Sequence, residues 1–168
     1  RIEKQKNLPM MLDAFKIVQK KFPDYKLIIY GDGTEKLNAI KYAKEINIYN
    51  NVDFKGFIPN LHKEILDSSL FISTSDFEGI SNSMLEAMAI GLPTICTDCP
   101  CGGAKMAIEN EINGILSPVR DTNKFAENMI KVLDNKELMY KLSKNSVKIK
   151  DKYNLEKIFE NWKKIIDQ

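Results

Sequence analysis

Short runs of β-forming apolar residues alternate with longer amphipathic stretches along this chain. The runs, which we predict to be strands, cover residues 26–30, 52–55, 70–74, 94–97 and 114–117. They lie roughly 20 residues apart, so each gap has room for one helix. A regular alternation of strands and helices favours parallel strands joined by right-handed crossovers. We therefore predict an α/β fold class: a Rossmann-like open parallel sheet with helices on both faces, followed by C-terminal helices.

The stretches between the strands carry apolar residues at helical spacing. In the first stretch these residues are Leu8, Met11, Leu12, Phe15 and Val18. In the second, over about 35–45, we expect Leu37 and Ile40 to point inward. Further helices are predicted over 61–66, 83–90, 102–109, 123–133, 137–148 and 155–166.

The chain has the size and composition of one globular domain. It contains 168 residues, of which 43% are hydrophobic and 29% are charged. A sheet of this kind usually opens with a strand, yet the chain opens with a polar run, Arg1 to Asn7. We therefore expect residues 1–168 to be a single domain of a larger protein, cut just after its first strand.

The charge pattern argues against a nucleic-acid partner. The formal net charge is +2, and a nucleic-acid site needs a concentrated basic face. The C-terminal third leans basic, which favours a solvated helix face; weak peripheral contact with an anionic membrane is the alternative. No run approaches the roughly 18 apolar residues that span a bilayer. We expect a cytoplasmic protein, with the inner face of the membrane as a second location.

The three cysteines do not predict a metal site. Cys96, Cys99 and Cys101 cluster, but a structural zinc site usually has four ligands and His62 is far away in the sequence. Reduced thiols in a cytosolic protein fit this pattern better than disulfides do.

The most informative segment runs from Asp76 to Thr94. It places two carboxylates, Glu78 and Glu86, eight positions apart at the start of a predicted helix. Free N–H groups at a helix start favour an anion, and carboxylates accept hydrogen bonds from sugar hydroxyls. This combination indicates a sugar-nucleotide site, in which the amides of residues 79–81 hold a diphosphate. For Glu86 the alternative is a capping box with Ser83.

Two further groups fall where the ends of neighbouring strands are expected. Gly31 and Gly33 form half of a dinucleotide fingerprint, but Lys36 replaces the third glycine, so a simple tight turn fits as well. Arg1 and Lys6 could each reach a phosphate, or could be two solvated cations. The sequence contains no P-loop, no G-x-S-x-G elbow and no D-x-D pair.

The segment from Glu78 to Glu86 resembles the E-x7-E motif of retaining glycosyltransferases, and the run to Pro93 continues in the same style. The opening Arg1-x4-Lys6-Asn7 resembles the G-R-x4-K-N segment of those enzymes without its glycine. Residues 30–33, 52–56 and 113–118 also follow in family order. The chain therefore resembles the C-terminal, donor-binding domain of glycosyltransferase family 4, which has the two-domain GT-B fold. Residues 98–103 are similar to members that build bacterial capsule, O-antigen or exopolysaccharide.

The resemblance implies a role for each candidate residue. Arg1 and Lys6 would neutralise the donor diphosphate, assisted by the backbone amides of Gly79, Ile80 and Ser81. Glu86 would bind the ribose, Glu78 would touch the transferred sugar, and the base would lie near Phe57 and Ile58. The donor would be a UDP-sugar, by family frequency, with no metal and no further cofactor. The glycan or lipid-linked acceptor would bind an N-terminal domain that this chain lacks, and residues 155–166 match the helix that crosses back to that domain.

The resemblance leaves alternatives. A sugar-nucleotide 2-epimerase shares the GT-B architecture, and a non-catalytic nucleotide-binding module shares the scaffold. Many family members have a bulky residue and a glycine at the positions of Ile80 and Ser81, and His62 does not match the family's active-site histidine. We expect the isolated chain to bind a donor weakly and to transfer nothing.

Overall fold

All five predicted strands are present, and their ends agree with the prediction to within one residue. The structure, a computed structural model, describes residues 1–166, and at positions 155 and 161 the backbone alone. The strands are β1 (Leu27–Tyr30), β2 (Val52–Gly56), β3 (Phe71–Ser73), β4 (Thr94–Thr97) and β5 (Ile115–Ser117). Every strand pair is parallel, as predicted. The α/β fold class is therefore confirmed.

The strands are divided between two parallel sheets. One contains β1 and β2, with Leu27 opposite Val52, and the other has the order β3-β4-β5, with Ile72 opposite Ile95. The two sheets are close, because Ile72 of β3 packs against the apolar clusters of both. Within the described residues, however, β1 and β3 form no ladder with each other.

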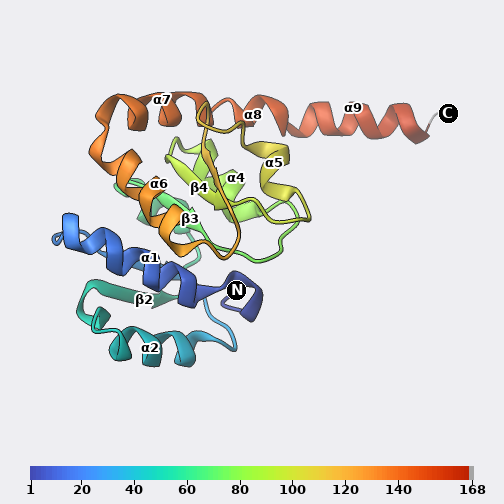
Figure 1. Ribbon diagram of the computed structural model, residues 1–168. Helices are drawn as coiled ribbons and strands as arrows, with labels where there is room; N and C mark the ends of the chain where they lie inside the picture. The colour runs from blue at the N-terminus through green and yellow to red at the C-terminus, as the bar shows by residue number, and fades with distance from the viewer. Residues whose placement is uncertain (167–168) are drawn as a thin grey trace.

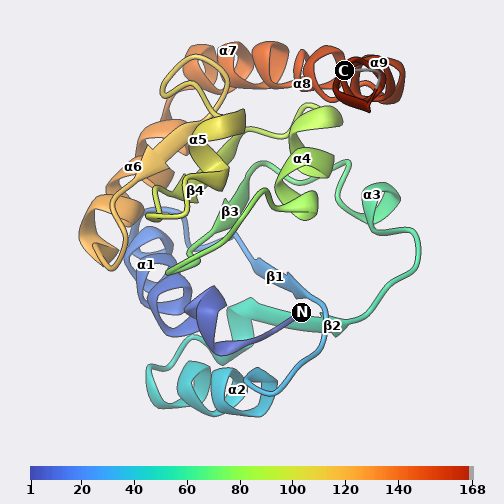
Figure 2. The ribbon, with the colours of Figure 1, turned by 90° about the vertical axis from the view of Figure 1, so that its right-hand side faces the viewer.

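Helices enclose the strands on both sides. Their bounds are α1 (Leu8–Lys21), α2 (Lys36–Glu45), α3 (Leu61–Glu64), α4 (Asn82–Ala89), α5 (Gly103–Ala107), α6 (Thr122–Asp134), α7 (Lys136–Ser146), α8 (Ile149–Lys152) and α9 (Leu155–Ile166). In Figures 1 and 2, α2 lies at one end of the molecule and α7 to α9 lie at the other, with the strands between them. The helix predicted over 137–148 corresponds to α7 to within two residues, whereas the short helix α8 was not predicted.

The central helix α1 joins the two halves of the core. Leu12 and Phe15 pack with the residues of the β1–β2 sheet, whereas Ala14 and Val18 pack with those of β4, β5 and α6. Helix α1 also lies directly against α6. Because α1 faces both sheets, it fixes the position of its own N-terminus, which carries Lys6 and Asn7.

Helix α2 buries a different face from the one predicted. Ala39 and Ala43 point inward, whereas Leu37 is 78% exposed and Ile40 is only partly buried. Residues four apart share a helix face, and Leu37 lies about 200° around the helix from Ala39. Both alanines belong to the apolar cluster that also contains Leu27 and Ile29 of β1.

Helix α9 extends away from the rest of the molecule (Figure 1). Its apolar side chains Phe159, Trp162, Ile165 and Ile166 are exposed on it. Across residues 1–166, no helix combines the length and the apolar character needed to cross a membrane.

Candidate functional site

Lys6 and Glu78, which are 72 positions apart, meet at the carboxyl ends of the strands. The Lys6 ammonium donates a hydrogen bond to Glu78 Oε2 and forms an ion pair with it. Ser75 Oγ donates to the same oxygen at 3.1 Å. The carboxylate is thus held from two sides and is only partly exposed. The structure brings together two of the three residues that the sequence assigned to the reacting end of the donor.

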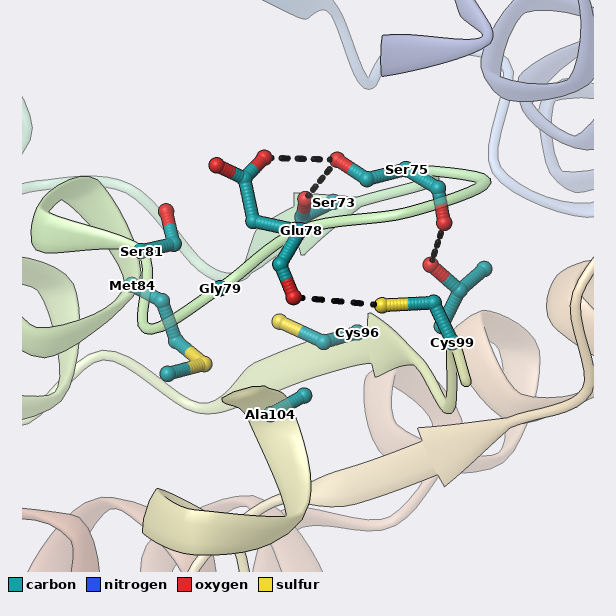
Figure 3. Close-up of a pocket in the computed structure, with 10 residues that line it drawn as sticks. Ser73, Ser75, Glu78, Gly79, Ser81, Met84, Cys96, Cys99 and Ala104 are labelled. Carbon is teal, nitrogen blue, oxygen red and sulfur yellow. Dashed lines mark hydrogen bonds between the residues drawn. The ribbon is translucent and has the colours of Figure 1, made fainter. Parts of the chain in front are cut away.

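The loop that carries Glu78 is anchored to β4. Thr97 Oγ1 donates to the Ser75 carbonyl at 2.5 Å, and Cys99 Sγ donates to the Glu78 carbonyl at 3.6 Å. Figure 3 shows the Glu78 carboxylate directed toward Ser75, with the sulfur atom of Cys96 on the other side of the loop. These contacts fix both the backbone and the side chain of Glu78.

Glu78, Gly79 and Ser81 border a cavity of about 10 Å³ between this loop, β4 and α5. Such a volume holds about one water molecule. A nucleotide cannot enter it, so a ligand at Glu78 would lie across the open edge of the sheet.

The backbone of residues 79–81 offers free hydrogen-bond donors. No acceptor among the described residues bonds to the N–H groups of Gly79, Ile80 or Ser81. They immediately precede α4, whose first turn adds further free amides and the positive end of the helix dipole. The arrangement is suited to an anion.

Gly103 explains why the loop can take this path. A Cβ atom at Gly103 would lie 1.9 Å from the Gly79 carbonyl oxygen and 2.7 Å from the Ile80 nitrogen. Only a glycine at the start of α5 permits this approach. By contrast, a Cβ at Gly79 itself would meet no described atom within 4 Å.

Glu86 is exposed on α4, and the alternative of a capping box does not form. The helix begins at Asn82 with Ser81 as its N-cap, so Ser83 lies inside the helix, where its hydroxyl is 3.0 Å from that of Ser81. Within residues 1–166, no side chain or amide bonds to the Glu86 carboxylate. Glu86 therefore remains available to a ligand.

The glycines after β1 make room for the first residues of the chain. A Cβ at Gly33 would lie 2.2 Å from the Ile2 carbonyl oxygen, and the Ile2 amide donates to the Asp32 carbonyl at 2.8 Å. Gly31 has φ +109°, a conformation that favours glycine. The turn thus positions the exposed Arg1 at this edge of the sheet.

The Asp32 side chain stabilises the same turn. Its carboxylate accepts from the Lys36 ammonium at 3.0 Å and from the Gly33 amide at 3.0 Å. These bonds, that of Lys36 first, hold the pKa of the Asp32 carboxyl below its ordinary value. The conformation of Gly31 and the close packing of Gly33 explain why glycines occur at these two positions. A contact of Gly31 or Gly33 with the donor remains a prediction.

Phe57 and Ile58 follow β2, at the outer edge of the smaller sheet. Phe57 is 79% exposed. Among the described residues, no hydrogen bond or ion pair joins Phe57, Ile58 or Glu86 to the Lys6–Glu78 pair. The structure therefore leaves their predicted contacts with the base and the ribose as expectations.

Two supporting residues were missed in the sequence. Ser75 lies two residues after β3 and Thr97 ends β4, and their hydroxyl groups hold the Glu78 loop. Their position at the carboxyl ends of parallel strands was the available signal. Across residues 1–166 there is no group of three or more His, Cys, Asp or Glu side chains that could hold a metal ion.

Comparison with known proteins gives a consistent result. The family model described as "Glycosyl transferases group 1" matches residues 1–149. The poly(glycerol-phosphate) alpha-glucosyltransferase of Bacillus subtilis is 30% identical over 100% of this chain and 25% of its own length. The poly(ribitol-phosphate) alpha-N-acetylglucosaminyltransferase of Staphylococcus aureus is 32% identical over 94% of this chain and 32% of its own length.

A solved structure supports the same likeness. The crystal structure of a mutant of S. aureus TarM in complex with Fondaparinux, alpha-GlcNAc-glycerol and UDP superposes with a TM-score of 0.93 at 28% identity. The match covers 100% of this chain and 34% of that chain. The chain spans between a quarter and a half of the length of the curated relatives that it matches.

Proposed function

The chain belongs to the glycosyl transferases group 1 family, and from this premise we propose that it is the donor-binding half of a retaining glycosyltransferase of family 4. Its fold is that of the C-terminal domain of GT-B glycosyltransferases. The proposed reaction transfers a hexosyl group from a nucleotide-diphosphate sugar to a glycan or lipid-linked acceptor in the synthesis of a surface polysaccharide. The pairing of Lys6 with Glu78, beside the free amides of residues 79–81, is the observation that carries this proposal.

The proposed chemistry depends on the charge that the diphosphate gains as the glycosidic bond breaks. Lys6, Arg1 and the amides of residues 79–81 would stabilise this charge without having to reorganise. In the donor complex the Lys6 ammonium would exchange part of its contact with Glu78 for a phosphate oxygen. Glu78 would then be free to accept from a hydroxyl of the transferred sugar, and Glu86 would accept from the ribose. Because Lys6 and Arg1 would neutralise the charge of the diphosphate, we propose that the reaction needs no metal.

The names of the relatives support retention and a UDP-sugar. Both curated relatives described above are alpha-transferases by name, and the TarM crystal contains UDP. Sugar nucleotides such as UDP-glucose are α-linked, so transfer that gives an α-linkage retains the configuration. We extend both properties to this chain as a proposal.

We further propose that residues 1–168 are one domain, and that a separate N-terminal domain binds the acceptor. The greater length of the relatives supports this division. The exposed apolar face of α9 would pack against that domain. We place the reaction in the cytoplasm, with peripheral contact at the inner face of the membrane. Neither a 2-epimerase nor a non-catalytic module is favoured by a specific observation, and the relatives described above are glycosyltransferases by name.

Calorimetry with UDP, GDP and ADP tests the proposal. We expect one of these nucleotides to bind the wild-type protein, and both Lys6→Ala and Glu86→Ala to weaken that binding. Lys21→Ala is a matched control, because Lys21 lies in an exposed ion pair with Asp134 at the far end of α1, about 20 Å away. Failure of all three nucleotides to bind would overturn the proposed donor role.

Activity of the full-length enzyme tests the chemistry. Lys6→Ala should lower turnover about 100- to 1,000-fold, the usual cost of removing one preorganised donor. Transfer should continue in EDTA, and an absolute requirement for a divalent ion would contradict the metal-free mechanism. Conversion of a UDP-sugar to its epimer without any acceptor would instead indicate a 2-epimerase.

A further inference from the structure

Three consecutive backbone carbonyls around Lys6 accept hydrogen bonds from the segment that leads to Glu78. Thr74 Oγ1 lies 2.9 Å from the Lys6 carbonyl oxygen and 3.1 Å from that of Asn7. The Asp76 amide donates to the Gln5 carbonyl at 2.8 Å. The Thr74 side chain is 1% exposed, so water cannot replace its hydroxyl without a structural change. These three hydrogen bonds hold the turn that carries Lys6 against the loop that carries Glu78, and we call them the clamp.

Side chains reinforce the same contact. Asn7 adopts φ +47°, caps α1 by accepting from the Met10 amide, and donates from Nδ2 to Asp76 Oδ1 at 3.0 Å. Arg120 reaches both Asp76 oxygens, at 3.3 and 3.2 Å. Asp76 thus ties the first turn of α1 to the loop after β5.

The ion pair alone cannot set the position of Lys6. Lys6 has four rotatable side-chain bonds, and partly exposed ion pairs contribute little toward holding two flexible side chains in one geometry. The hydrogen bonds of the buried Thr74 hydroxyl restrict the chain more strongly, because breaking them leaves that hydroxyl without a partner in the interior. The distance between the Lys6 backbone and Glu78 is therefore set by the clamp.

We infer that Thr74 is a positioning residue for Lys6, and that its hydroxyl acts through the Lys6 and Asn7 carbonyls. This inference rests on the proposed function, since the consequence of the clamp is the placement of the Lys6 ammonium against a donor diphosphate. A fixed cation stabilises the diphosphate better than a mobile one, because it does not have to reorganise when charge develops. Thr74 itself touches no ligand.

Three variants test the role of the Thr74 hydroxyl. Thr74→Val keeps the shape of the side chain and removes both hydrogen bonds, so we expect UDP to bind about tenfold more weakly. Thr74→Ser keeps the hydroxyl and should restore binding. Thr94→Val is a matched control: Thr94 is also fully buried and donates to a backbone carbonyl, that of Leu92 at 3.0 Å, but it lies at the amino end of β4, away from the site. It should leave UDP binding unchanged.

A double-mutant cycle separates positioning from general stability. In a Lys6→Ala background the Thr74→Val change should no longer affect UDP affinity, because the group that Thr74 positions is absent. An equal loss in both backgrounds would overturn the inference, and so would wild-type affinity in Thr74→Val.

Hydrogen exchange tests, without any ligand, whether the Thr74 hydroxyl holds the two segments together. In Thr74→Val the Asp76 amide, which donates to Gln5, should exchange faster with solvent, whereas amides inside α6 should not. Unchanged protection of Asp76 would overturn the clamp even if UDP binds. If the wild-type protein binds no nucleotide, the proposed function fails, but exchange at Asp76 still tests the clamp.

Discussion

Gly103 is the residue at which the structure of the site is most sensitive to a single methyl group. Gly103→Ala would place a Cβ 1.9 Å from the Gly79 carbonyl oxygen, a backbone atom that cannot rotate away. Overpacking of this kind costs about 1–3 kcal/mol. We expect Gly103→Ala to lower the free energy of unfolding by this amount, measured by urea denaturation, and to weaken UDP binding because the amides of residues 79–81 must shift.

Gly79→Ala is the control for the stability measurement. No described atom lies within 4 Å of the added methyl group, so we expect a stability change within about 0.5 kcal/mol. Equal stability of Gly103→Ala and the wild type would show that the α5 start can move away from the loop, against the packing described above.

The cysteines offer a second test at the scale of single residues. Cys96 and Cys99 are buried, whereas Cys101 is exposed. Burial, and to a lesser extent the neighbouring Cys99, raises the pKa of the Cys96 thiol. Because the thiolate is the reactive form, a raised pKa keeps Cys96 protonated and inert at pH 8. Iodoacetamide should therefore modify Cys101 alone in the native protein, and all three cysteines in urea, as read by mass spectrometry. Native labelling of Cys96 as fast as that of Cys101 would contradict the buried position.

The sequence predicted part of this site, for identifiable reasons. Lys6 and Glu78 fall within motifs of fixed spacing, so both could be singled out before their contact was known. Thr74 could not, because a hydroxyl that bonds to backbone carbonyls 67 and 68 positions away leaves no pattern in the sequence. The Asp76–Arg120 pair joins residues 44 positions apart and is equally invisible.

At the scale of elements, strands were predicted better than helix faces. The five strands are short apolar runs at regular spacing, such as the run that contains Ile95. Each run forms a strand in the structure, with ends within one residue of the prediction. Helix α2 was placed correctly but its buried face was not, because Ala39 and Ala43 carry a weaker apolar signal than Leu37. The short helix α8 was not predicted, because its four residues are too few to show a helical spacing of apolar side chains.

Helix α9 presents an apolar face that a second domain could cover. Its exposed residues Phe159, Trp162 and Ile166 lie along one apolar face, and Trp162 is the only tryptophan of the chain. Under the proposed two-domain arrangement this face packs against the N-terminal domain and loses contact with water. Trp162 should then fluoresce as a solvent-exposed indole in residues 1–168 alone, and at shorter wavelength in the full-length enzyme.

The comparison needs a subtraction, because a longer protein can contain other tryptophans. The difference between the full-length enzyme and its Trp162→Phe variant isolates the signal of Trp162. If the difference spectrum is that of an exposed indole, α9 does not pack against a second domain, and that part of the proposal is wrong. Neither outcome tests the Lys6–Glu78 site, which depends on the contacts of Lys6, Ser75 and Glu78.

At the scale of the whole molecule, the first seven residues connect the two sheets. Ile2 bonds to the turn after β1, where its amide donates to Asp32, and the carbonyls of Gln5, Lys6 and Asn7 bond to the segment after β3. The proposed diphosphate site therefore lies across the junction of two separate ladders. This position explains why the residues of the site come from two distant segments, residues 1–6 and residues 78–81.

Under the two-domain proposal, we expect a further strand between β1 and β3. A segment that leads into Arg1 and Ile2 arrives at the carboxyl ends of both strands, so under the two-domain proposal it would run between them as a further parallel strand. It would pair with the backbone groups of β1 and β3 that do not bond to β2 or β4. We expect the amides of β1 and β3 on these facing edges to exchange slowly with solvent in the full-length enzyme and faster in residues 1–168 alone. Amides within α6 should be protected in both and serve as the internal control. Equal exchange of the β1 and β3 edges in the two proteins would show that no strand joins the sheets, and the division into two ladders would then be a property of the complete enzyme.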